Sequence, residues 1–433
     1  MPLEIPGSAT VFLPLLEKLL QILKTWWWLP LPFLFWKPFI IIYFYFIKER
    51  WDNTIPKVIL EIKIPKEVLK PIKAMEQVFA GFHAIHDVFT WREKWLEGQF
   101  QLSLSLEIVS FGGEVHFYIR VAEMFREIIE SNIYSQYPEA EIFAVEDYTK
   151  AVPQDIPNKD WELWGTSFIN TKPDPYPIKT YVKFEAEREI KEEKRIDPLA
   201  GFLEGMAGLK PGEQLWLQIR AVPIRDEKPW VKQGLEIKDK LVRRPEKAKF
   251  KPIIQEAAEV LITGKPPGEA PLEEKEIIPP EMKLTPGERE IVAAIEEKIS
   301  KFGFDCHIRF IYLAKRDVFL KPRARFAFGL FKEVSYENIG GLKPDKTTMT
   351  KVKSVPFWFL DKRRVYIRQR RLFRNYQKRW PPWFPRAGGT YILNTEELAT
   401  LFHFPGRIVA PASGIPRIEA KKGEAPPEVP LEE

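Results

Sequence analysis

The sequence is poor in the side chains that most often build disulfides and metal sites. It contains one cysteine, Cys306, so no disulfide can form within the chain, which suits a reducing compartment. Its five histidines are scattered. His83 and His86 stand three apart in a helical pattern and His116 falls on a predicted strand, but such residues are more often polar groups at the edge of a core. We therefore expect no metal site.

The chain also lacks the glycine-rich loop that binds nucleotide phosphates, which has the pattern G-x-x-x-x-G-K-[ST] after a strand. Residues 263–265 (TGK) are followed by Pro266, which has no backbone N–H to offer a phosphate. Residues 340–343 (GGLK) are followed by Pro344 and have no upstream glycine at the required spacing. We predict no nucleotide hydrolysis site, no catalytic residue and no cofactor, and hence a protein that is not an enzyme.

One long apolar stretch lies near the N-terminus. Residues 26–47 are apolar except for Lys37, and about 22 residues of helix span roughly 33 Å, against about 30 Å for the hydrocarbon layer of a bilayer. Tryptophans begin the stretch and basic residues follow it, and a basic flank faces the cytoplasm. We predict a membrane anchor at residues 26–50, single-pass or monotopic, with a cytoplasmic body after it. Its anchor residues are Trp26, Trp27, Trp28, Phe33, Phe35, Trp36, Phe39, Ile40, Ile41, Ile42, Phe44 and Phe46.

Prolines leave the geometry of this anchor open. Pro30, Pro32 and Pro38 each remove a backbone donor, and they predict that a regular helix begins only near Pro38. Residues 39–47 alone are too short to span, so a helix lying in the interface plane is one alternative and a buried packing segment is another. Residues 1–25 form an amphipathic segment, predicted to lie along the membrane surface or to pack as an ordinary helix.

Residues 57–150 follow the order β-α-β-β-α-β. Val58, Leu60 and Ile62 alternate with more polar positions as in a half-buried strand, and residues 111–114 (FGGE) are typical of a hairpin. This order is that of the ferredoxin-like arrangement, in which helices cover one face of a four-stranded antiparallel sheet. We therefore predict the α+β class, with a ferredoxin-like domain at 57–150.

The remaining parts are distinguished by their composition. Residues 150–177 are predicted as an ordered connector, and residues 178–320 as a second α+β domain that is a divergent copy of the first. This domain begins with a predicted strand at 180–185 (TYVKFE) and contains a Pro- and charge-rich insertion at 225–284. Residues 321–405 are a basic and aromatic C-terminal region, and 406–433 are a Pro-rich linker or tail. Capping patterns predict helices that start at Thr285 and at Asn394 or Thr395.

The strongest chemical signal is a basic run within residues 357–380, which aromatic residues interrupt. Asp361 is the one acidic residue in this range. Such a surface can neutralise phosphates and stack bases, so we predict contact with nucleic acid. The alternatives are contact with anionic lipid and contact with protein. The predicted contact residues are Lys362, Arg363, Arg364, Arg368, Arg370, Arg371, Arg374, Lys378 and Arg379.

Several stretches carry a family resemblance. They are LEIKIPKEVLKPIKAMEQVFAGFHA (60–84), SLEIVSFGGEVHFYIR (105–120), YSQYPEAEI (134–142), DPLAGFLEGMAGLKPGEQLWLQI (197–219), LDKRRVYIRQRRLFRNY (360–376) and GGTYILNTEELATLFHFP (388–405). In these stretches the chain resembles the membrane-anchored N-terminal region, a domain of unknown function, of bacterial type IV secretion and conjugation-type DNA-transfer ATPases. The resemblance runs from the anchor to the tail.

In such proteins a proline-rich linker leads into an ATPase of the FtsK–HerA type, whereas this sequence ends at Glu433, within such a linker. The resemblance therefore implies either a shortened ATPase or a non-catalytic subunit that positions a separate P-loop ATPase at the membrane. The expected partners are that ATPase, DNA, membrane lipids and further copies of the chain. The alternative is a membrane-tethered nucleic-acid-binding protein or lipid-contacting scaffold without an ATPase partner.

Overall fold

The structure is a computed structural model, and it describes residues 18, 21, 24–26, 28–65, 70–186, 197–224, 229–242, 284–353, 358–382 and 389–406. The chain divides into two units. The helix unit contains residues 1–55, 88–100 and 383–387, and the sheet unit contains the rest. Most of the predicted amphipathic segment, most of the predicted insertion and almost all of the predicted tail lie outside the described residues.

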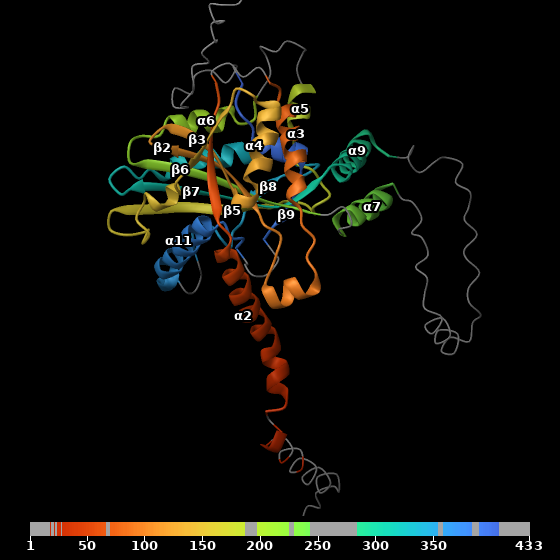
Figure 1. The fold of residues 1–433 in the computed structure, drawn as a ribbon, viewed down its shortest axis with the longest axis vertical. Coiled ribbons are helices and arrows are strands. Elements are labelled where there is room, and N and C mark those ends of the chain that lie inside the picture. Colours follow the sequence, from red (N-terminus) through yellow and green to blue (C-terminus); the bar gives the residue numbers. More distant parts are fainter. Residues whose placement is uncertain are drawn as a thin grey trace, which may run out of the picture. The chain divides into compact units, whose positions relative to one another are not determined.

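The sheet unit is a mixed α+β fold built on one antiparallel sheet (Figure 1). The strand order is β4-β1-β3-β2-β6-β7-β5-β8, and β9 pairs with β7. The strands are β1 Lys57–Lys63, β2 Leu104–Phe111, β3 Glu114–Ala122, β4 Glu141–Val145, β5 Trp161–Asn170, β6 Glu213–Pro223, β7 Gly303–Lys315, β8 Leu342–Pro344 and β9 Tyr391–Asn394.

The two halves of this sheet have the same strand order. They meet at the antiparallel pair β2–β6. Moving outward from this pair, the order is β2, β3, β1, β4 in one half and β6, β7, β5, β8 in the other. In each half, the second strand along the chain is therefore followed by the third, the first and the fourth. Helices also occupy matching places, since α6 precedes the second strand of its half, as α3 does, and α10 precedes the fourth, as α4 does.

Successive side chains of each strand point to opposite faces of the sheet, and different helices cover the two faces. On one face Phe117 of β3 packs against Phe402, which follows α12, and Phe168 of β5 packs against Phe331 of α10. On the other face Trp216 of β6 packs against Phe373 of α11. The helices of the sheet unit are α3 Ile72–Phe82, α4 Arg126–Gln136, α5 Tyr181–Ala186, α6 Ala200–Ala207, α7 Pro229–Leu241, α9 Pro286–Ser300, α10 Arg325–Glu333, α11 Asp361–Lys378 and α12 Thr395–Leu401.

Several local predictions are confirmed. The α+β class is correct, and the predicted hairpin at 111–114 joins β2 to β3. The capping boxes are present, with Thr285 accepting from the Glu288 N–H and Asn394 accepting from the Glu397 N–H.

Two secondary-structure predictions for the sheet unit are wrong. Residues 180–185 do not form a strand, because α5 spans Tyr181–Ala186 and the Tyr181 N–H bonds to the Thr400 hydroxyl. The predicted connector at 150–177 contains β5, which lies between β7 and β8. Residues 163–168 of β5 are buried, so this strand shows no polar alternation in its sequence.

The helix unit contains α2, Pro30–Thr54. The predicted start near Pro38 is wrong, because Pro30 and Pro32 occupy the first turn, where backbone N–H groups have no partner within the helix. Pro38 lies inside the helix. Exposed apolar side chains follow along α2, including Phe35, Trp36, Phe39, Ile42 and Phe46. Within the part of the chain that is described, no helix has both the length and the apolar character needed to cross a membrane.

Candidate nucleic-acid interface on helix α11

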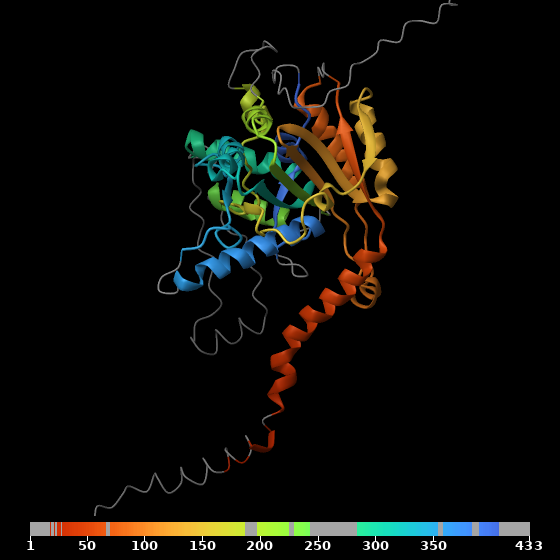
Figure 2. The same cartoon turned by 90° about the vertical axis from the view of Figure 1, so that its left-hand side faces the viewer.

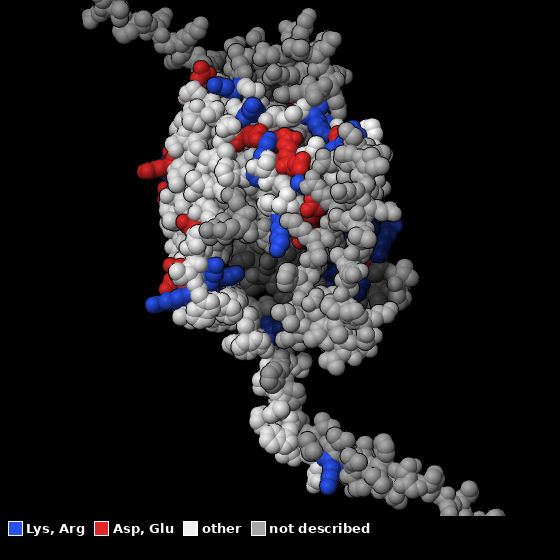
Figure 3. Space-filling view, turned by 90° about the vertical axis from the view of Figure 1, so that its right-hand side faces the viewer, with Lys and Arg blue, Asp and Glu red and all other residues white. Residues whose placement is uncertain are grey.

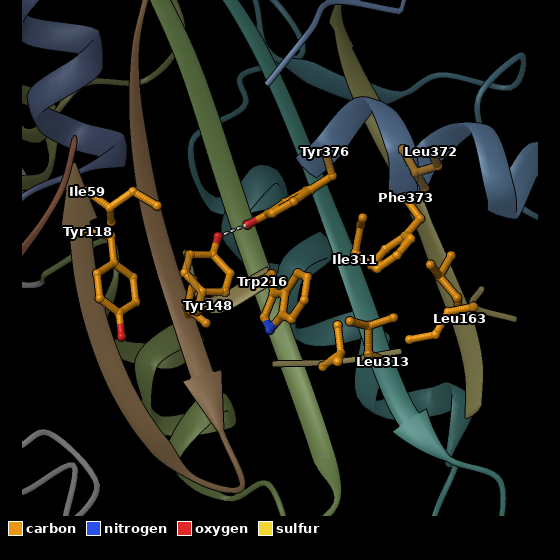
Figure 4. Packing of buried hydrophobic residues seen from close by; sticks show 13 residues of the cluster. Ile59, Tyr118, Tyr148, Leu163, Trp216, Ile311, Leu313, Leu372, Phe373 and Tyr376 are labelled. Atoms are coloured by element: carbon orange, nitrogen blue, oxygen red, sulfur yellow. Dashed lines mark hydrogen bonds between the residues drawn. The ribbon is translucent and has the colours of Figure 1, made fainter. Parts of the chain in front are cut away.

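The basic run folds as α11, an 18-residue helix with one buried face. Gln369, Leu372, Phe373 and Tyr376 point to the sheet, and Figure 4 shows the last three packed over Trp216 and Ile311. The spacing of these four residues is the helical i, i+3, i+4, i+7 pattern. Because this pattern buries the apolar positions, the basic positions between them remain on the outside.

A glycine in β5 permits the close approach of α11. A Cβ at Gly165 would lie 2.9 Å from Leu372 Cδ2 and 2.4 Å from the Phe310 carbonyl oxygen. Beside it, Gln369 Nε2 donates to the Leu163 carbonyl oxygen at 2.6 Å and to Glu162 Oε1 at 2.8 Å. The sheet therefore sets the position and rotation of α11.

Helix α11 is drawn in blue in Figure 2. Its exposed positions carry cations together with one aromatic and one aliphatic side chain. Tyr366 and Ile367 are each 48% exposed. At about 1.5 Å per residue the helix is roughly 27 Å long, which is enough to follow several phosphates of a nucleic-acid backbone. The exposed cations are Lys362, Arg363, Arg371, Arg374 and Lys378.

Three predicted contact residues are half-buried and have local partners. Arg368 Nη1 donates to the carbonyl oxygens of Lys346 and Met349 at 3.0 and 2.9 Å. Arg370 Nη1 reaches the Gln154 carbonyl oxygen at 3.4 Å, and Arg364 lies 3.9 Å from Asp361. Arg368 in particular holds the loop before α11. Among the exposed cations, Lys378 also has a local partner, because its Nζ lies 4.1 Å from the centre of the Trp380 ring.

Arg379 is corrected from a contact residue to a buried one. Its side chain is 1% exposed, and it ends α11 in the left-handed conformation with φ 55°. Nε donates to Glu107 Oε1 at 3.0 Å and Nη2 to Glu107 Oε2 at 3.2 Å, while Nη1 pairs with Asp147. Arg379 therefore fastens the end of α11 to β2 and to the segment after β4.

Glu107 is the centre of this buried cluster. Besides Arg379 it accepts hydrogen bonds from Ser105 and Tyr148 at 2.6 Å each and from Gln218 at 2.8 Å. The Tyr148 hydroxyl lies 2.8 Å from that of Tyr376 on α11, as Figure 4 shows. Every acceptor site of the carboxylate thus has a donor, which is what allows a full charge to remain buried.

The cluster depends on ionised carboxyl groups. Burial alone would raise the pKa of Glu107, but the charge of Arg379 and hydrogen bonds from Arg379, Ser105 and Tyr148 hold that pKa below its ordinary value. The pKa of Asp147 is likewise lowered, because Arg379 and Thr149 outweigh burial.

Acid is therefore expected to weaken the sheet unit through these groups. A lowered folded-state pKa contributes stability above the unfolded values of about 4.3 for Glu and 3.9 for Asp, and this contribution is lost as pH falls through the lower folded values. Urea unfolding should show that the free energy of unfolding falls more between pH 6 and pH 3 in the natural chain than in Asp147→Asn. Equal losses in the two proteins would contradict a role for Asp147.

Polar residues form rows across the buried face under α11. Glu107, Gln218 and Arg309 face one another in register on β2, β6 and β7. Arg220 pairs with His307 in the next row. Burial and the positive charge of Arg220 lower the pKa of Arg309 to about 9.

His307 is the most isolated member of these rows. Both of its ring nitrogens lack a hydrogen-bond partner among the described residues. Burial first, and then Arg309 and Arg220, hold its pKa well below the ordinary value, so the ring is neutral.

These rows were not predicted, although the sequence carries a signal for them. Each of the strands β2, β6 and β7 contains two polar residues that are two positions apart within an apolar run. These patterns are S-x-E at 105–107, Q-x-R at 218–220 and H-x-R at 307–309. Such spacing places both polar side chains on one face of a strand. Three strands with the same pattern indicate a shared polar layer.

The histidines that attracted attention in the sequence have separate partners. His83 Nε2 lies 2.8 Å from the Ile224 carbonyl oxygen, and His116 Nδ1 lies 2.6 Å from Glu61 Oε1. Among the described residues, no group of three or more His, Cys, Asp or Glu side chains is placed to hold a metal ion.

A groove of about 780 Å³ lies over β5, α10 and β8. Its walls include Trp164, Phe168 and Phe331. Its lining contains no carboxylate, imidazole or thiol, so these residues offer none of the usual acid–base pairs. Its cations are Lys321, Arg325, Lys332, Lys343 and Lys351.

Charge is arranged differently on the side of the molecule seen in Figure 3, where basic and acidic side chains lie next to one another. Pairs of this kind join α7 to α9 through Lys238 and Glu296 at 3.1 Å, and α5 to α9 through Lys183 and Glu290 at 2.5 Å. Mixed charges cancel at a distance, whereas the exposed cations of α11 share their helix with one acidic residue, Asp361.

No family model matches the chain, and no curated protein matches it either.

Proposed function

We propose that this chain is a non-catalytic, membrane-anchored subunit of a type IV secretion or conjugation-like DNA-transfer machine. In this proposal it positions a separate P-loop ATPase of the FtsK–HerA type at the membrane. The observation that carries the proposal is α11, where five exposed cations surround Tyr366 and Ile367 on a helix that the sheet holds in place. Cations neutralise phosphates, and the exposed ring of Tyr366 can stack on a base, so this face suits DNA.

The proposal includes a ferredoxin-like unit at residues 57–150. The order β4-β1-β3-β2, with every neighbouring pair antiparallel, supports it. The matching order in β5–β8 supports a second unit of the same kind, which would begin at β5. A duplicated sheet of this type would give a rigid support for α11.

The proposal also includes an anchor formed by α2. Trp26 and Trp28, before the helix, are 52% and 51% exposed, and Trp36 and Phe46 within it are 60% and 65% exposed. Side chains of this kind are costly in water and favourable in a bilayer or at its surface. Trp27 lies outside the described residues.

Co-purification from membranes tests this function. The full chain, expressed in its own cells and extracted with a mild detergent, should retain a P-loop ATPase through purification. The same chain with Arg363, Arg371 and Arg374 changed to alanine should retain the ATPase but lose associated DNA. Absence of any P-loop ATPase from the purified complex would contradict the proposal, and DNA without ATPase would favour a membrane-tethered nucleic-acid-binding protein.

A further inference from the structure

A short loop lies beside α2 within the helix unit. Residues Glu93–Glu97 form one turn of π-helix in this loop. The Tyr43 hydroxyl of α2 donates to the Trp95 carbonyl oxygen at 2.6 Å, and the ring of Phe44 meets that of Trp95 edge-on at 4.8 Å. The turn is thus attached to the C-terminal half of α2.

Further contacts fix the loop on the helix. The ring of Trp51 in α2 packs against Phe89 at 6.3 Å and against Phe100 at 5.1 Å. Gly98 has φ +75°, and a Cβ there would lie 2.5 Å from the Ile47 carbonyl oxygen, so only glycine allows this approach. The loop therefore has a defined place along α2.

Although it is well attached, the loop presents apolar side chains to the outside. Val88 is 71% exposed, Trp91 67% and Leu96 60%. The rings of Trp91 and Trp95 stack at 6.1 Å. A cluster of exposed large apolar residues on an ordered turn is unusual for a surface in water and indicates a contact with an apolar phase or a partner.

We infer that residues 88–97 form a second membrane-contacting element, which rests in the headgroup region of a phospholipid bilayer beside α2. This inference rests on the proposed anchoring by α2. The exposed apolar side chains of this loop add to those of α2, where Ile42 and Phe46 are 56% and 65% exposed. Trp91 and Trp95 are the residue type that favours the lipid–water boundary. The segment has two basic and two acidic side chains, and Arg92 pairs with Glu97 at 3.7 Å, so it carries no net charge into an uncharged headgroup region.

This contact fixes how deeply α2 enters the bilayer. The side chains of Tyr43 and Phe44 lie at the level of Trp95, so the interface crosses α2 at these residues. The Lys48 ammonium group lies 5.3 Å from the centre of the Phe44 ring and 5.8 Å from that of Phe100, next to this boundary. Lys48 and Arg50 therefore lie on the aqueous side of the lipid–water interface.

Site-specific labelling in vesicles tests the inference. The one natural cysteine, Cys306, is buried, so introduced cysteines can be labelled selectively with a small fluorophore. The full chain is reconstituted in phosphatidylcholine vesicles with and without brominated acyl chains, which quench only fluorophores that touch lipid. Leu96→Cys reports on the loop, Phe39→Cys on α2, and Met124→Cys, 67% exposed in the sheet unit, serves as the control.

We expect brominated lipid to remove most of the fluorescence at positions 39 and 96 and little of it at position 124. Quenching at position 39 without quenching at position 96 would overturn the inference and leave the anchor in place. No quenching at either position would overturn both. A blue-shifted but unquenched label at position 96 would indicate contact with protein, such as a second copy of the chain, and would also overturn the inference.

Discussion

Replacing Arg379 with alanine is expected to lower the free energy of unfolding of the sheet unit by about 3–5 kcal/mol, the usual cost of removing one partner from a buried ion pair. The reason is that Glu107, whose side chain is 0% exposed, would keep its charge without its main cation. Asp147 would lose the same partner, and the end of α11 would lose its attachment to β2.

Urea unfolding followed by tryptophan fluorescence measures this loss, because Trp216 lies under α11. Arg371→Ala is the matched control, since it removes the same side chain from an exposed position of the same helix. This control should change stability by less than about 0.5 kcal/mol. A loss below about 1 kcal/mol for Arg379→Ala would contradict the view that this residue fastens α11 to the sheet.

The triple change Arg363→Ala, Arg371→Ala and Arg374→Ala is expected to have the largest effect on DNA binding. These three side chains are exposed on α11. If each neutralises one phosphate, the slope of log K against log salt for duplex DNA should become less steep by about 2.7. Relative to 1 M salt, where this electrostatic contribution vanishes, affinity at 0.1 M salt should then fall by about 500-fold. Fluorescence anisotropy with a labelled duplex over a series of salt concentrations measures both quantities.

A second triple variant separates a local contact from a general effect of charge. Lys159, Lys210 and Lys240 are exposed elsewhere on the sheet unit, and changing them to alanine removes the same net charge. We expect this variant to bind DNA almost as the natural chain does. Equal weakening by the two triple variants would contradict a specific role for α11, and so would a salt slope that the first triple variant leaves unchanged.

Much of the sheet unit was predictable because its signals are local. Leu60 and Ile62 of β1 flank Glu61, and Leu106 and Ile108 of β2 flank Glu107, so both strands show a period of two. In β2 this period survives burial of both faces because Glu107 is a buried polar residue. The capping box at Thr285 depends on two residues three apart. The helical character of α11 follows from the spacing of Leu372, Phe373 and Tyr376, which the basic residues do not disturb.

The errors occurred where tertiary contacts decide the outcome. β5 is buried on both faces, so Leu163, Trp164 and Phe168 give no period of two. The segment 180–185 suits a strand by residue type. It nevertheless forms a helix, and the first N–H of that helix, from Tyr181, donates to the hydroxyl of the distant residue Thr400.

The candidate site was predicted in composition but not in detail. The sequence places Arg379 in the same basic run as Arg371 and Arg374, and nothing local distinguishes it from them. Its burial arises because α11 ends there and its guanidinium reaches Glu107, 272 residues earlier in the chain. Such long-range pairing is beyond the reach of periodicity, whereas the S-x-E, Q-x-R and H-x-R patterns of β2, β6 and β7 were available as a hint.

If one chain holds DNA through α11 while α2 keeps it at a membrane, as we propose, vesicle flotation tests both parts at once. Vesicles of uncharged phosphatidylcholine are used so that anionic lipid cannot compete for the cations. We expect labelled duplex DNA to float with vesicles that carry the natural chain, and to remain at the bottom with vesicles that carry the Arg363, Arg371 and Arg374 triple variant. DNA that stays at the bottom with the natural chain, or floats equally with the triple variant, would contradict the account.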